Sequence, residues 1–137
     1  MSKSERLSVI ILHVSDLEKS LRFYRDAIQI PLESGFNAPA DDPWFGGHHA
    51  ELSWREGAYL HFALFPARPT HRVTSGVELA FPVDDAARAH VRLIAAGAIV
   101  LHQPRLEPWG WCARYVDPDG NIVGLTSRVQ SLASGSP

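Results

Sequence analysis

The sequence has few of the features that mark several large classes of protein. Its one cysteine, Cys112, cannot form an internal disulfide and has no partner thiol for a structural zinc site, so a small, partly buried residue is expected there. No apolar run approaches the roughly 18 residues that span a bilayer. The first residues show neither a long apolar segment nor a small-residue cleavage site. We therefore expect a cytoplasmic protein that makes no membrane contact.

Positive charge is also scarce, which bears on the kind of partner. The chain has 13 Lys and Arg against 15 Asp and Glu, and its formal net charge is −2. A nucleic-acid-binding protein normally concentrates basic residues in a patch or a run, and this sequence has only scattered ones. We expect a small-molecule partner and no nucleic acid.

What the sequence does contain is an internal repeat, with an offset of about 69 residues. The first copy is "VIILHVSDLEKSLRFYRDAIQIPL" and the second is "VELAFPVDDAARAHVRLIAAGAIVL". Each begins with an apolar strand and continues with apolar residues at helical spacing. Val83 matches Val14, and Gly97 closes the second helix where Gln29 stands in the first. Two copies of one unit, each a strand followed by a helix, are predicted.

Each half then ends in a hairpin, "AELSWREGAYLHFALFP" in the first and "CARYVDPDGNIVGLTS" in the second. Aligning the two turns places His61 opposite Gly124. Eight strands and two long helices follow, an α+β protein with strand, helix and three strands in each half. We expect one domain over residues 1–137, with module one at about 7–66, module two at about 76–128 and a fraying tail at 129–137.

The main difference between the halves is the segment "ESGFNAPADDPWFGGHH", which reads as an insertion rich in Pro, Gly and Asp. It carries Trp44 and Phe45, and exposed aromatic side chains on a loop need something to cover them. Two interpretations stay open, a cap on the edge of the core and a lid over a ligand.

The pair "HVSDLEKSLRFYRDAIQIPL" and "PWGWCARYVDPDGNIVGL" resembles the glyoxalase, bleomycin-resistance and extradiol-dioxygenase superfamily, also called vicinal oxygen chelate. The resemblance covers roughly residues 7 to 128. It implies two tandem βαβββ modules that form a curled mixed sheet around one cleft, and it implies a homodimer, as is common among members. It does not imply one reaction, because members include lyases, dioxygenases and proteins that sequester antibiotics.

Metal-using members of that superfamily place one ligand on the first and last strand of each module. The resemblance puts these positions at Val9, His61, Glu78 and Gly124. Valine and glycine supply no ligand atom, and two ligands leave a divalent ion largely to water. We expect no cofactor, and if a divalent metal is held, His61 and Glu78 would hold it.

Period-two alternation predicts which side chains share the face of the cleft. Arg114 shares a face with Gly124, and by the repeat Glu51 shares one with His61. Buried charges need partners, which suggests the couples Glu51 with Arg114 and His61 with Glu78. A solvated hairpin face remains open as an alternative, and a register slip of one residue would exchange the two faces. The predicted ligand contacts are His13, Trp44, Phe45, Glu51, Tyr59, Trp109 and Arg114, and the predicted catalytic residues are Glu78 and His61.

Two functions of different classes are consistent with these residues. The first is a metal-free binding protein for a small aromatic or cationic molecule, similar to the bleomycin-resistance branch. The second is an enzyme related to the glyoxalases and dioxygenases. It would use either a metal on the residual ligands or proton transfer between a desolvated Glu78 and His61.

Overall fold

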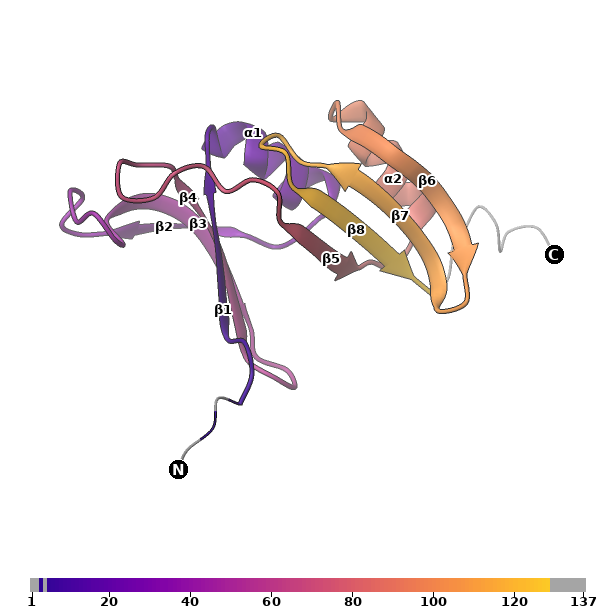
Figure 1. The fold of residues 1–137 in the computed structure, drawn as a ribbon, viewed down its shortest axis with the longest axis horizontal. Helices are drawn as coiled ribbons and strands as arrows, with labels where there is room; N and C mark the ends of the chain where they lie inside the picture. Colours follow the sequence, from indigo (N-terminus) through magenta and orange to yellow (C-terminus); the bar gives the residue numbers. More distant parts are fainter. Residues whose placement is uncertain (1–2, 4, 129–137) are drawn as a thin grey trace. The chain divides into compact units, whose positions relative to one another are not determined.

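The computed structural model describes residue 3 and residues 5–128 (Figure 1). The chain divides into two compact units. The first unit comprises the chain up to Leu17 together with Pro31–Val73, and the second comprises Glu18–Ile30 and the chain from Thr74 onward. The helix of the first module is therefore grouped with the second module. That the whole chain forms one domain stays a prediction, and the predicted tail at 129–137 lies outside the described residues.

The first unit contains a four-stranded mixed sheet in the order β1-β4-β3-β2. β1 is parallel to β4, and the other neighbours are antiparallel. Val9 pairs with His61 between β1 and β4, and Ser53 pairs with His61 across the β3–β4 hairpin. The strands are β1 Val9–Val14, β2 Glu33–Asn37, β3 Gly47–Trp54 and β4 Leu60–Pro66.

The second unit repeats this plan with the order β5-β8-β7-β6. β5 is parallel to β8, and the remaining neighbours are antiparallel. The shared strand order confirms the internal repeat and the α+β fold of two tandem βαβββ modules. The strands are β5 Glu78–Pro82, β6 Ile99–Glu107, β7 Gly110–Val116 and β8 Ile122–Ser127.

Both helices end where the sequence predicts. Asp85 caps the second helix, because its side chain accepts hydrogen bonds from the backbone N–H groups of Ala87 and Arg88 at 3.0 and 3.1 Å. Gly97 after this helix has φ of 82°, and Gln29 after the first has φ of 71°, so the two matched positions share the left-handed conformation. The helices are α1 Leu17–Leu21, continued by the π-helix η1 Arg22–Ala27, and α2 Ala86–Ala95.

Each sheet has one strongly apolar face. In the second unit α2 contacts β6, β7 and β8, and Leu93 of the helix and Val123 of the sheet are fully buried. In the first unit Leu12, Phe62 and Leu64 alternate with side chains of the other face and are also buried. The opposite face of each sheet carries the polar residues. We call these the open faces of the first and second units.

The segment predicted as an insertion is partly strand. Glu33–Asn37 forms β2 and pairs with the beginning of β3, so the true loop spans only residues 38–46. Alternation within β2 was hidden by its serine, glycine and asparagine, which are uncommon in strands. Within the described part of the chain, no helix is long and apolar enough to cross a membrane.

Candidate functional site

The open face of the first unit brings together residues that the alternation rule predicts to share a side of the sheet. Glu51 pairs with Ala63 and Ser53 with His61, so Glu51, Ser53 and His61 point the same way. The same parity places His49 on this face. The predicted common orientation of Glu51 and His61 is therefore confirmed. Tyr59 lies in the turn that precedes β4, with its side chain exposed.

A chain of short contacts runs across this face. His49 Nε2 lies 2.9 Å from Glu51 Oε1, and its Nδ1 lies 3.1 Å from the carbonyl oxygen of Gly47. Because that carbonyl only accepts, Nδ1 is the donor, and a proton must also lie between His49 Nε2 and Glu51. His61 Nε2 lies 3.6 Å from the same Glu51 oxygen, and His61 Nδ1 lies 2.8 Å from Ser53 Oγ. One carboxylate therefore lies between two imidazoles.

His13 lies at the far end of β1, stacked on His71 with ring centroids 4.4 Å apart. Burial, together with the neighbouring positive charge of His71 and Arg68, lowers the pKa of His13. The rings of Trp44 and His71 have a T-shaped arrangement, with their centroids 4.9 Å apart. The predicted contact residues His13 and Trp44 are thus joined through His71, which the sequence analysis did not select.

The loop at residues 38–46 is held by several hydrogen bonds. Arg68 donates to the carbonyl oxygens of Asp42 and Gly46, both at 2.7 Å. The Asp42 side chain accepts from the backbone N–H groups of Trp44 and Phe45, and these bonds lower the pKa of its carboxyl group. Trp44 and Phe45 nevertheless remain exposed. The loop presents two aromatic side chains on a fixed backbone.

The open face of the second unit carries an ion pair. Arg114 Nε donates to Glu78 Oε2 at 3.1 Å, and Arg114 Nη1 lies 3.3 Å from His102 Nε2. Arg114 pairs with Gly124, and Cys112 pairs with Thr126, as the predicted face requires. Cys112 is buried, which confirms the structural interpretation of that residue.

Within each unit the polar groups have partners of their own: Glu51 contacts His49 and His61, and Glu78 on β5 contacts Arg114 on β7, across the intervening strand β8. The expected couples of Glu51 with Arg114 and of His61 with Glu78 would join the two units, and they stay predictions. The expected desolvation of Glu78 is wrong, because 56% of its side chain is exposed.

The four positions that metal-using relatives would fill do not suit a metal ion. Val9 lies beside His61, so the first unit offers one imidazole. In the second unit Ile122 lies directly beside Glu78, and Gly124 lies one alternation further, beside Ala80. Neither Ile122 nor Gly124 supplies a ligand atom, so Glu78 has no second metal ligand on the neighbouring strand. Among residue 3 and residues 5–128 there is no group of three or more His, Cys, Asp or Glu side chains arranged for a metal.

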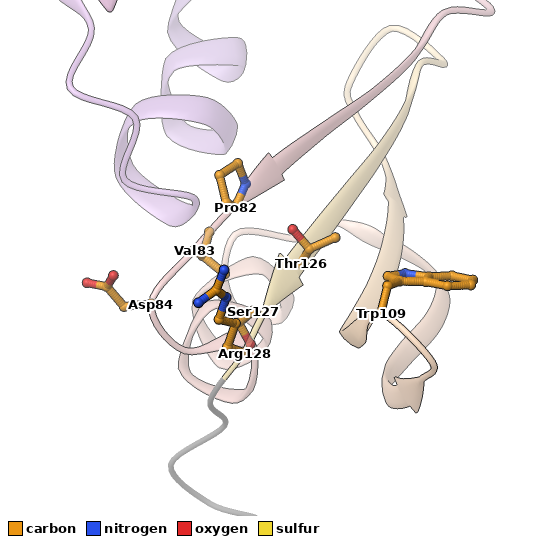
Figure 2. Close-up of a pocket in the computed structure, with 7 residues that line it drawn as sticks. All are labelled: Pro82, Val83, Asp84, Trp109, Thr126, Ser127 and Arg128. Carbon is orange, nitrogen blue, oxygen red and sulfur yellow. The ribbon is translucent and has the colours of Figure 1, made fainter. Parts of the chain in front are cut away.

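A cavity of about 400 Å³ lies at the end of the second sheet where β5 and β8 finish. Figure 2 shows Trp109 on the β6–β7 hairpin with its indole directed away from the other labelled residues, Thr126 on β8 and Arg128 just beyond that strand. Trp109 is 66% exposed. Among the described residues, neither Asp84 nor Arg128 has an ion-pair partner. The cavity is lined by Pro82, Val83, Asp84, Trp109, Thr126, Ser127 and Arg128.

Besides His71, the sequence analysis missed three polar groups that the structure places on these surfaces. Ser53 lies two residues after Glu51 on the same strand, so the alternation that selected Glu51 could have selected it. His102 meets Arg114 because the register of β6 shifts between Val100 and His102, which no local rule predicts. Arg128 lies just after the last strand and had no signal beyond its charge.

Comparison with known proteins agrees with this architecture. The protein-family model described as the glyoxalase-like domain matches residues 9–126 of this chain. The structure of TnmS3, an antibiotic binding protein from Streptomyces sp. CB03234, has a TM-score of 0.63 and 26% identity, covering 93% of this chain and 98% of that one. A glyoxalase/bleomycin resistance protein from the same strain has a TM-score of 0.59 and 29% identity, covering 88% and 99%.

Lactoylglutathione lyase from Agrobacterium tumefaciens has a TM-score of 0.58 at 20% identity, covering 92% of this chain and 96% of that one, and so shares the fold. No curated protein sequence matches the chain. The family match covers most of the chain, and the chain belongs to the glyoxalase-like domain family within the glyoxalase and bleomycin-resistance superfamily.

Proposed function

We propose that this protein binds a small planar molecule, aromatic or cationic, without the help of a metal ion. The observation that carries the proposal is the cavity at the end of the second sheet, with the exposed indole of Trp109 at its margin. Its volume of about 400 Å³ lies within the usual range of small-molecule pockets. The likeness to an antibiotic binding protein along nearly the whole of both chains supports the same function.

The charged residues that line this cavity are Asp84 and Arg128, and a carboxylate attracts a cationic group. Asp84 and Arg128 lack ion-pair partners among the described residues, so both charges are available to a bound molecule. The predicted ligand contacts of the first unit stay predictions, namely His13, Trp44, Phe45, Glu51 and Tyr59, and so do the predicted catalytic residues Glu78 and His61.

A fluorescence screen tests this function. Planar aromatic compounds with and without a cationic group, antibiotics among them, are titrated while tryptophan emission is followed. We expect saturable binding that favours cations and that weakens when Asp84 is replaced by Asn. The control is Glu18→Gln, which removes an equal charge from α1. A panel without a single saturable hit would contradict the proposal.

We also propose that the protein is a cytoplasmic homodimer. The edge strand β6 supports the dimer, because its residues Ile99, Leu101 and Leu106 are exposed and an apolar edge strand tends to be covered. Light scattering at micromolar concentration should give twice the chain mass of 15.1 kDa. A mass equal to one chain would refute the dimer and leave the binding function intact.

A further inference from the structure

We propose that Ser53, His61 and Glu51 form a nucleophilic triad that gives this protein a hydrolytic activity toward small carboxylic esters. Their order in space is that of a nucleophile, a base and a group that orients the base. Ser53 Oγ lies 2.8 Å from His61 Nδ1, and His61 Nε2 lies 3.6 Å from Glu51 Oε1. The contact between nucleophile and base is within hydrogen-bonding distance, and such contacts are often looser in ligand-free structures.

The strands hold these side chains in place. Ser53 and His61 are directly paired across the β3–β4 hairpin, and Glu51 follows one alternation along β3. Glu51 is itself fixed by the buried His49, whose Nε2 lies 2.9 Å from the same carboxylate oxygen. The proposal requires the His61 tautomer with its proton on Nε2, which faces the Glu51 carboxylate at 3.6 Å, because Nδ1 is then unprotonated and can accept the Ser53 hydroxyl proton. Glu51 therefore acts as a positioning residue.

The site is open to a substrate and has a donor for the charge that develops. The side chains of Ser53 and His61 are partly exposed, on the open face of the first unit. The Tyr59 hydroxyl lies 3.4 Å from Ser53 Oγ, and the guanidinium of Arg55 lies over the Tyr59 ring at 5.5 Å. A hydroxyl at this distance can donate a hydrogen bond to an oxyanion formed on the carbon that Ser53 attacks.

The reaction balances without any added oxidant or metal. Ser53 Oγ bonds to the carbonyl carbon of the ester while its proton moves to His61 Nδ1, and the carbonyl electron pair moves to oxygen. When the oxyanion collapses, the bond to the leaving alkoxide or phenoxide breaks, and that group takes the proton from His61. Water then attacks the acyl-Ser53 with His61 again as base, which releases the carboxylic acid and restores the serine.

Covalent labelling is the first test, because fluorophosphonates react rapidly only with an activated serine. We expect one adduct per chain by intact mass spectrometry, and peptide mapping should place it on Ser53. Ser53→Ala should abolish the adduct. Ser34→Ala should label like the parent, since Ser34 lies on the neighbouring strand β2 with its side chain on the opposite face. No adduct, or an adduct on another serine, would overturn the proposal.

Hydrolysis of p-nitrophenyl acetate then assigns the roles. His61→Asn should lower kcat roughly 100-fold, as loss of a general base does, and Tyr59→Phe at least tenfold, as loss of an oxyanion donor does. Glu51→Gln should lower kcat with KM unchanged, and Glu51→Asp should restore part of it. Urea unfolding checks each variant, and Tyr59→Phe changes only an exposed hydroxyl. Parent-like kcat in His61→Asn and Tyr59→Phe would overturn the proposal, even if ligand binding in the second unit is confirmed.

Discussion

The two modules use their hairpin turns in opposite ways. In the second unit the turn at residues 117–121 is built around Asp117, which is buried and accepts four hydrogen bonds. Asn121 is also buried and joins this turn to the strand entering the sheet through Val77 and Thr74. The turn at residues 55–59 of the first unit is exposed and lacks such a buried anchor. The turn of the second unit is therefore anchored in the core, and the exposed turn of the first unit presents Arg55 and Tyr59.

The open faces of the two units also differ in the polar side chains that they carry. The first unit places Ser53 and His61 side by side behind its exposed turn. The second unit has Ile122 and Gly124 on the corresponding strand, and its polar side chains are an ion pair between Arg114 and Glu78. A repeated module can thus anchor the hairpin turn of one copy by buried hydrogen bonds and leave the turn of the other copy exposed.

The largest expected effect comes from removing the anchor of the second turn. Asp117→Ala leaves the Tyr24 hydroxyl and the turn N–H groups without their buried acceptor, so the free energy of unfolding should fall by about 3 kcal/mol. Glu56→Ala in the exposed turn should change it by less than about 0.5 kcal/mol. Urea denaturation of both variants measures the difference. Equal losses would show that the two turns do not differ in this way.

A smaller effect should separate the two exposed tryptophans. Trp109→Ala removes the aromatic side chain at the margin of the cavity and should weaken binding of a planar ligand about tenfold. Trp44→Ala removes an indole of similar exposure from the loop of the first unit and serves as the matched comparison. Calorimetric titration gives both dissociation constants. If the Trp109 variant binds like the parent, the cavity is not the binding site.

The smallest effect is a pH dependence of stability. Burial lowers the pKa of His90 in the second unit, and burial with His71 and Arg68 lowers that of His13 in the first. The unfolded chain binds these protons more tightly than the folded chain. The free energy of unfolding should therefore be highest above about pH 6.5 and should decline as the pH falls through the folded-state pKa values. His13→Gln and His90→Gln should each reduce this decline. His71→Gln should reduce it through His13 alone, and thermal melts from pH 7.5 to 5 measure all three.

Much of the fold was predictable because its signals are local. The strand and helix of each module repeat at one offset, and Gly97 marks the end of a helix by its conformation. Period-two alternation correctly assigned Glu51 and Arg114 to the open faces. These features depend on neighbours along the chain or directly across a hairpin.

The partners of the site residues were not predictable to the same degree. The pairing of Glu78 with Arg114 depends on the strand order, which puts β8 between β5 and β7, and the meeting of Arg114 with His102 depends on irregular register in β6. The position of β2 was missed because Ser34, Gly35 and Asn37 weaken its strand pattern. The sequence shows which side chains have the chemistry for a functional site. The pairing of strands that are distant along the chain determines which of these side chains meet.

The most direct test of the proposed function is calorimetry of the best fluorescence hit with protein dialysed against a chelator, with metal content measured by elemental analysis. We predict binding of one ligand per chain with an unchanged dissociation constant before and after chelation, and less than one-tenth equivalent of any divalent metal. Binding that disappears with the chelator, returns with one equivalent of zinc, nickel, manganese or iron, and is absent in His61→Ala would contradict the account.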